Sequence, residues 1–140
     1  WQSLNLKNPH RLLRALEIIM QTNKSIVEFQ TNKNKQRPFT CIILGLQRDR
    51  TQLYNLINNR VEMMFEMGLE KEVKLLLDYQ HLPILQTVGY SELFDYFNKK
   101  VSVQFAKEKI KQHTRNYAKR QITWFNKNKE IQWIHLDNQN

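Results

Sequence analysis

The sequence predicts a mainly α-helical fold with two short β-strands. In several long segments apolar residues recur three or four positions apart, which is the spacing of one face of a helix. Only two short runs, FTCIILGL and IQWIHL, have the composition or alternation of a strand. With 140 residues, 41% of them hydrophobic, the chain is long enough for about one domain with a core. Because two isolated strands make a marginal sheet, we expect a larger sheet whose other strands lie outside this chain.

The first helix is expected over residues 9–21. Asn8 suits its N-cap, and Pro9 suits its first position, where a backbone N–H has no helical partner. The apolar face of this helix consists of Leu12, Leu13, Leu16, Ile19 and Met20. The polar, basic segment at 31–38 ends in proline and is expected to be a loop.

A buried strand is expected at 39–46, with Cys41 inside it as a buried structural thiol. Asp49 should cap the next helix, which ends at Gly68 because glycine readily adopts the left-handed conformation at a helix C-terminus. The apolar side of this helix consists of Leu53, Leu56, Ile57, Val61, Met64 and Phe65.

Three further helices and a strand complete the prediction. Helices are expected at 69–79 and 91–97, separated by a turn-rich segment containing Pro83 and Gly89. Ser102 should cap a long helix over 103–126. Alternating residues then predict a strand at 131–136.

The charge of the chain favours a polyanionic partner. The formal net charge is +9, and residues 107–120 hold six basic residues against one acidic residue. Tyr117, Trp124 and Phe125 interleave with arginine and glutamine, a mixture suited to unstacked RNA bases. A solvated helix face with ordinary core aromatics is the alternative interpretation.

Other classes of protein are disfavoured. One cysteine excludes an internal disulfide and fits a reducing compartment, and the four histidines lack metal-ligand spacing, so no metal site is expected. No apolar run approaches the roughly 18 residues that span a bilayer. We therefore expect a cytoplasmic protein, monomeric, with no membrane partner.

Four segments resemble one family. NPHRLLRALE at 8–17, the helix pair at 48–73, LQTVGYSEL at 85–93 and YAKRQITWF at 117–125 are similar in content and spacing to the tRNA dimethylallyltransferases. Enzymes of this family transfer a dimethylallyl group from dimethylallyl diphosphate to the exocyclic amine of the adenosine 3′ of the anticodon. The resemblance implies a P-loop-containing α/β transferase of which this chain is the helical C-terminal part.

The resemblance also implies two regions and what each does. Residues 1–38 would end a helical insertion and include the basic loop, and residues 39–140 would belong to the transferase core. The P-loop pattern G-x-x-x-x-G-K-[ST] and the general base of the family are absent. Any Mg²⁺ would therefore be bound mainly by the missing half, and the chain alone is expected to be inactive.

Roles for individual residues follow from the same resemblance. Arg60 matches the arginine directed at the diphosphate, where a planar guanidinium offers two parallel donors; the alternative is a surface arginine paired with Glu66 or Asp49. Trp124 is expected to anchor the last helix more than to meet RNA. The residues expected to contact the tRNA anticodon stem-loop are His10, Arg11, Leu12, Leu13 and Arg14; Gln86, Thr87, Val88, Gly89, Tyr90 and Ser91; and Lys119, Arg120, Gln121, Ile122, Thr123, Trp124, Phe125 and Asn126.

Two other functions stay open at this point. The chain could be a stand-alone basic helical RNA-binding module without catalysis, or a helical protein-interaction domain. RNA binding should weaken with salt, whereas binding to a protein partner should survive it.

Overall fold

The computed structural model describes residues 8–29 and 38–136. The chain divides into two compact units, Trp1–Thr40 and Cys41–Asn140. The predicted loop at 31–38 lies outside the described residues except for its last position. In the described part, no helix is both long and apolar enough to cross a membrane.

The first unit contains α1 (Pro9–Thr22) and α2 (Ile26–Phe29). As predicted, Asn8 caps α1: its Oδ1 accepts a hydrogen bond from the Arg11 N–H at 3.3 Å, and Pro9 takes the first position. The apolar face predicted for this helix is not covered by other described residues of the first unit. Met20, for example, is 83% exposed, and Ala15 is the buried residue of α1.

The short helix α2 was not predicted. Its signal is the sequence S-x-x-E at 25–28, a capping box. The Ser25 hydroxyl accepts a hydrogen bond from the Val27 N–H at 3.3 Å, and Glu28 Oε1 accepts one from the Ser25 N–H at 2.8 Å. These two bonds satisfy backbone donors that a single helical turn cannot pair internally.

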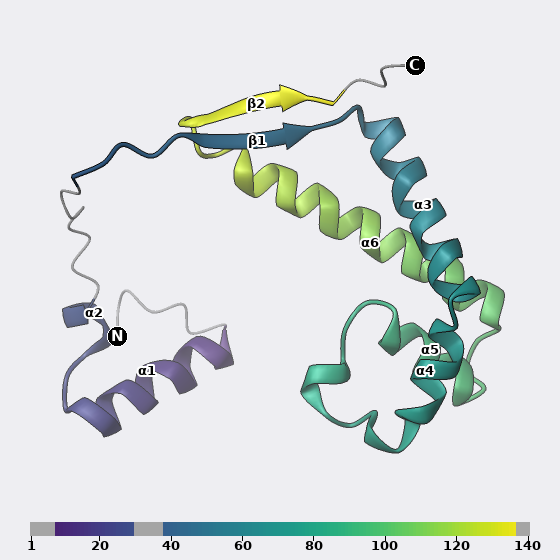
Figure 1. Cartoon of the computed structure of the whole chain (residues 1–140). Coiled ribbons are helices and arrows are strands. Elements are labelled where there is room, and N and C mark those ends of the chain that lie inside the picture. The colour runs from purple at the N-terminus through teal and green to yellow at the C-terminus, as the bar shows by residue number, and fades with distance from the viewer. Residues whose placement is uncertain (1–7, 30–37, 137–140) are drawn as a thin grey trace. The chain divides into compact units, whose positions relative to one another are not determined.

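The second unit is built on two long helices, α3 (Arg50–Glu66) and α6 (Val103–Phe125). α4 (Leu69–Leu75) and α5 (Tyr90–Phe97) pack at one end of this pair, and the two strands lie at the other end (Figure 1). Single 3₁₀ turns, η1 (Leu77–Tyr79) and η2 (Pro83–Leu85), lie between α4 and α5. The predicted helix at 69–79 is therefore an α-helix followed by a 3₁₀ turn.

The capping residues predicted from the sequence start and end these helices. Asp49 Oδ1 accepts the N–H groups of Thr51 and Gln52 at 2.8 and 3.2 Å, and the Ser102 hydroxyl accepts the Phe105 N–H at 3.2 Å. Gly68 separates α3 from α4 with φ at +103°, a conformation that is strained for other residues.

The core lies where the four helices meet. Its buried members are Val61, Leu69, Val73, Leu93, Phe94, Ala106 and Ile110. Because each helix contributes at least one side chain, the core fixes the relative positions of α3, α4, α5 and α6. The predicted apolar side of α3 is only partly correct, since Ile57 and Val61 are buried whereas Leu56 is 49% exposed.

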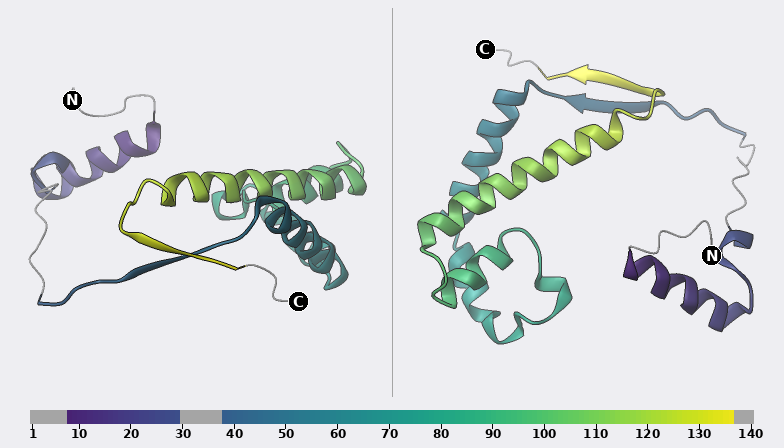
Figure 2. Two further views of the ribbon diagram at one scale, coloured as in Figure 1. Left: turned by 90° about the horizontal axis from the view of Figure 1, so that it is seen from above. Right: turned by 180° about the vertical axis from the view of Figure 1, so that it is seen from behind.

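β1 (Ile43–Gln47) and β2 (Ile131–His135) pair in parallel, with Ile43 opposite Ile131 (Figure 2). Gly45 is opposite Trp133, and a Cβ at Gly45 would lie 2.7 Å from the Trp133 ring, so glycine makes room for it. The prediction of a mainly helical fold with two short strands is confirmed.

The prediction of a buried strand at 39–46 is wrong in two respects. The strand occupies Ile43–Gln47, and most of its residues are exposed, with Leu46 at 67%. Cys41 precedes the strand and is exposed, so it is not a core thiol. The physical reason is that parallel strands are buried only when layers cover both faces, and the described residues supply no such layers.

Candidate functional site

An open cavity of about 480 Å³ brings together three of the segments singled out in the sequence. Arg60 comes from α3, Thr87 and Val88 from the segment before α5, and Tyr117 from α6. The remaining lining residues are Ile57, Val61, Met64, Ile110 and Thr114. Val61 and Ile110 also belong to the core, so the floor of this cavity, hereafter the Arg60 cavity, is rigidly supported.

Arg60 itself is exposed, and its guanidinium has no hydrogen-bond or ion-pair partner within residues 8–29 and 38–136. The expected alternative, a pair with Glu66 or Asp49, is not formed. Asp49 instead accepts the backbone N–H groups of Gln52 and Thr51, which lower its pKa. The charge of Arg60 is therefore available to a ligand.

The segment 86–91 is fixed by hydrogen bonds from both sides. The Gln86 side-chain amide donates to the Gln80 carbonyl at 2.5 Å, so this donor is engaged within the chain. The Tyr90 hydroxyl donates to the carboxylate of Glu72, and this bond raises the pKa of Tyr90. Gly89 has φ at +103°, which only glycine adopts without strain.

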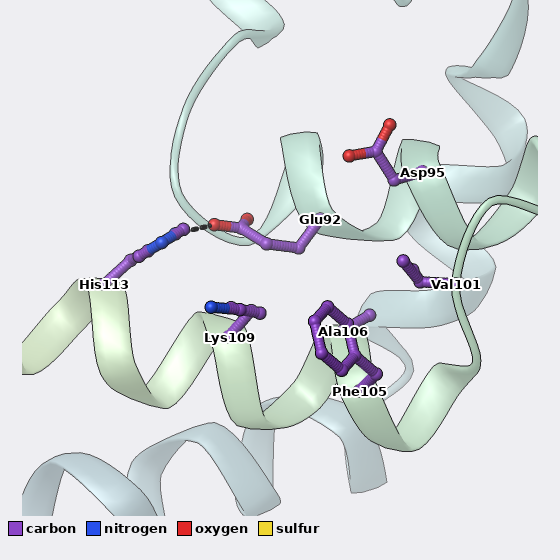
Figure 3. Close-up of a pocket in the computed structure, with 7 residues that line it drawn as sticks. All are labelled: Glu92, Asp95, Val101, Phe105, Ala106, Lys109 and His113. Carbon is purple, nitrogen blue, oxygen red and sulfur yellow. Dashed lines mark hydrogen bonds and ion pairs between the residues drawn. The ribbon is translucent and has the colours of Figure 1, made fainter.

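A buried carboxylate links this segment to α6 (Figure 3). Glu92 is 9% exposed; its Oε2 accepts the Gly89 N–H at 2.7 Å and its Oε1 lies 2.5 Å from Nδ1 of His113. The pair lines a small cavity of about 240 Å³ together with Asp95 and Lys109. Sequence reasoning missed both residues; the spacing of Gly89 and Glu92, an N-cap and N3 pair, is the signal that could have found Glu92.

The positive charge of α6 is less uniform than its sequence indicates. Lys107 and Lys111 each lie 2.7 Å from a carboxylate oxygen of Glu62 on α3, and Lys111 is also paired with Glu108. The hydrogen bonds from Lys107 and Lys111 lower the pKa of Glu62 to about 2, and the bond from Lys107 has the larger effect. Two of the six basic residues of this stretch, Lys107 and Lys111, are thus paired with carboxylates, so its net charge overstates the charge that is free to bind a polyanion.

The other four basic residues of the stretch keep their charge. Lys109, Arg115, Lys119 and Arg120 have no acidic partner among the described residues. The Arg120 guanidinium lies 5.7 Å from the centroid of the Tyr117 ring, a cation–π geometry. Cations and a flat ring therefore occur side by side on this part of α6.

All of the expected contact residues from Lys119 to Asn126 are exposed. Trp124 is 67% exposed and stacks edge-to-face on Phe125, with ring centroids 4.8 Å apart. The described residues of the second unit leave the Trp124 ring uncovered, so an anchoring role for Trp124 stays a prediction.

The segment 10–14 lies in the first unit, at the start of α1. Its side chains are exposed except for Leu12, which is half-buried. Arg14 donates to Glu17 at 3.1 Å, whereas His10 and Arg11 make no side-chain bond within the described part of the chain. This segment presents cations at the start of α1.

Mg²⁺ is the metal that the resemblance implies, and it was expected to be bound mainly outside this chain. Among residues 8–29 and 38–136 no three histidine, cysteine or carboxylate side chains form a group that could hold a metal ion. No step of the proposed reaction is therefore assigned to a metal on this chain.

Comparison with known proteins places these features in a family. Residues 1–128 match the family described as IPP transferase. The chain is 47% identical over 135 residues to tRNA dimethylallyltransferase 1 of Bacteroides thetaiotaomicron, with 96% of this chain and 44% of the relative covered. It is 44% identical over 139 residues to tRNA dimethylallyltransferase 1 of Phocaeicola vulgatus, with 99% of this chain and 46% of the relative covered. The chain thus spans less than half the length of these curated relatives.

Solved structures agree. The crystal structure of tRNA delta(2)-isopentenylpyrophosphate transferase from Staphylococcus epidermidis has a TM-score of 0.66 at 33% identity, over 96% of this chain and 45% of that chain. The full-length tRNA isopentenylpyrophosphate transferase from Bacillus halodurans has a TM-score of 0.66 at 34% identity, over 96% of this chain and 41% of that chain. The resemblance drawn from the sequence motifs is confirmed, and the chain belongs to the IPP transferase family.

Proposed function

We propose that this chain is part of an enzyme that transfers a dimethylallyl group from dimethylallyl diphosphate to the exocyclic amine of the adenosine 3′ of the anticodon in tRNA. The observation that carries the proposal is the Arg60 cavity, in which an unpaired arginine, the segment before α5 and an aromatic residue of α6 meet. The relatives that match this chain are named tRNA dimethylallyltransferase, which supports the transfer of a dimethylallyl group to tRNA.

Arg60 is proposed to bind the diphosphate. During transfer the bond between the dimethylallyl carbon and the diphosphate oxygen breaks, so negative charge develops on the leaving group. A guanidinium without a carboxylate partner can place two parallel N–H donors on those oxygens and stabilise this charge. The side chains of Ile57, Val61 and Met64 beside it would offer the prenyl group an apolar surface.

The three segments 10–14, 86–91 and 119–126 are proposed to bind the anticodon stem-loop. Residues 119–126 combine cations with two exposed aromatic rings, which suits the backbone and unstacked bases of an RNA loop. Thr87 and Val88 line the Arg60 cavity, so the segment 86–91 would bring the acceptor adenosine toward the diphosphate. Residues 10–14 would add phosphate contacts from the first unit.

The test is a transfer assay on the longer protein that carries this sequence. Incubated with dimethylallyl diphosphate and tRNA, that protein should produce dimethylallyl adenosine at the position 3′ of the anticodon, detected by mass spectrometry of the digested RNA. Product on any other nucleotide, or no product from a folded protein, would contradict the proposal.

A further inference from the structure

A third cavity, of about 450 Å³, lies beside the start of α3, and its lining contains two arginines and no carboxylate. The lining residues are Arg50, Thr51, Tyr54, Asn55, Asn58 and Arg115. All but Arg115 come from α3, and Arg115 lies on α6. None of them lines the Arg60 cavity, so this is a separate site on the same pair of helices.

Neutral side chains hold both arginines. Arg115 Nη1 donates to Asn58 Oδ1 at 2.6 Å, across the contact between α6 and α3. Arg50 Nε donates to the Tyr54 hydroxyl oxygen at 3.0 Å, and its guanidinium carbon lies 5.1 Å from the centroid of the Tyr54 ring. Such partners orient a guanidinium without neutralising it, and each arginine keeps further N–H donors for a ligand.

No acidic residue compensates these charges within the described parts of the chain. Asp49 is adjacent in sequence, but its carboxylate accepts the N–H groups of Thr51 and Gln52 and does not line the cavity. Lys107 and Lys111 differ from these arginines, because Glu62 forms an ion pair with both lysines. Two fixed, uncompensated guanidinium groups in one cavity make an anion site.

We propose that this cavity binds a phosphate group of the RNA backbone, with Arg50 and Arg115 as its ligands. The guanidinium fork matches the spacing of phosphate oxygens, and the Tyr54 hydroxyl, which accepts from Arg50, can still donate a hydrogen bond to the ligand. Lys119 is exposed four residues after Arg115 on α6, where i and i+4 positions share a face, so a neighbouring phosphate has a cation as well. This inference rests on the proposed function and adds an RNA contact outside the three segments assigned above.

The test measures binding of a fluorescent anticodon stem-loop RNA to the whole chain over a range of salt concentrations. Arg50→Gln and Arg115→Gln should each weaken binding about tenfold, since each removes hydrogen bonds to a charged group. The double variant should lower the slope of log K against log salt by about 0.7 to 0.9, the value for a single phosphate. Arg115→Lys should restore only part of the affinity, because an ammonium lacks the fork.

Lys71→Gln is the matched control, since it removes one positive charge from an exposed position of α4 away from the cavity. Melting curves should show every variant folded at the assay temperature, so that lost affinity is not lost folding. Arg115→Gln should melt somewhat below the wild type, because it loses the bond to Asn58. A second titration with inorganic pyrophosphate identifies the source of the phosphate: a selective loss of pyrophosphate binding by the arginine variants would keep the anion site but assign it to a diphosphate.

If the arginine variants bind RNA and pyrophosphate with the same affinities as the Lys71→Gln control, the proposed anion site is wrong. The transferase proposal would be unaffected by that result. A slope change about twice that expected would mean two separate phosphates and would contradict a shared site. Failure of the wild-type chain to bind either probe would count against the site and against the proposed RNA contacts together, whereas the transfer assay tests the activity by itself.

Discussion

Substitution of Arg60 distinguishes three roles for this residue: diphosphate binding, RNA binding and a structural role. In the longer protein, Arg60→Ala should lower kcat about 10²- to 10³-fold, as removal of a preorganised donor to a developing negative charge does in other enzymes. Arg60→Lys should recover little of this loss, since an ammonium keeps the charge without the two-donor geometry. Steady-state and single-turnover kinetics, together with tRNA affinity, provide the measurement.

Asn59→Ala is the control for Arg60, because Asn59 is the preceding exposed residue of α3. It should leave kcat unchanged. Reduced tRNA affinity with unchanged single-turnover chemistry in Arg60→Ala would move Arg60 from diphosphate binding to RNA binding. A large fall in melting temperature would instead show a structural role, which the exposure of the side chain makes an unexpected result.

Glu92 is expected to hold the segment 86–91 in place through the Gly89 N–H. Glu92→Ala removes the acceptor of a buried donor, which costs about 1–3 kcal/mol. Amide hydrogen exchange at Gly89 should therefore accelerate by about tenfold or more. Asp95→Ala is the control, since Asp95 lies on the same helix but pairs with Lys100 at the surface. Equal exchange rates at Gly89 in both variants would contradict the role assigned to Glu92.

At the scale of the elements, Glu62 joins α3 to α6 through two lysines, and its effect on stability depends on pH. The pKa of Glu62 falls from 4.5 to about 2 in the folded chain, so folding favours the ionised carboxylate. Its stabilising contribution is complete above a pH of about 4.5 and is lost as the pH falls toward 2.

Thermal denaturation tests this dependence. Glu62→Gln should melt below the wild type at pH 7, and the difference should shrink between about pH 4.5 and pH 2. Glu66→Gln, an exposed carboxylate on the same helix, should show no such trend. A difference for Glu62→Gln that stayed constant over this range would show that the amide changes packing rather than charge.

The helices and strands were predicted well from the sequence where their ends are determined by neighbouring residues in the chain. Asn8, Asp49 and Ser102 cap the helices they were expected to cap, because each supplies an acceptor at the position where backbone N–H groups lack partners. The helix α2 was missed although its capping box is visible in the sequence, because a four-residue helix has no periodic apolar pattern.

Burial was predicted less well, since it depends on what covers a surface. Cys41 and Leu46 have strand-like, apolar neighbours in the sequence but are exposed. The lysines of α6 were counted as free charge because the partner of two of them, Glu62, lies 45 positions from Lys107. Arg60 was identified only through the family resemblance, and its meeting with Thr87 and Tyr117 required the packing of α3 against α6.

At the scale of the whole molecule, the 140-residue chain is expected to have no transferase activity of its own. It contains no P-loop pattern to hold the phosphates of dimethylallyl diphosphate. In the assay described above, the chain alone should give no dimethylallyl adenosine above background, while the longer protein does. Turnover by the chain would contradict this division of the active site. A monomeric state and a cytoplasmic location stay predictions from the sequence.

The most direct test of the central claim, that this chain carries an RNA-binding surface, is a salt titration of its affinity for an anticodon stem-loop RNA. The claim rests on the net charge of +9 and on the exposed cations and rings of residues 117–126. If about four to six phosphates are neutralised, log K should fall with log salt at a slope of roughly −3 to −5. Affinity that does not change with salt, or no binding at low salt, would contradict the account.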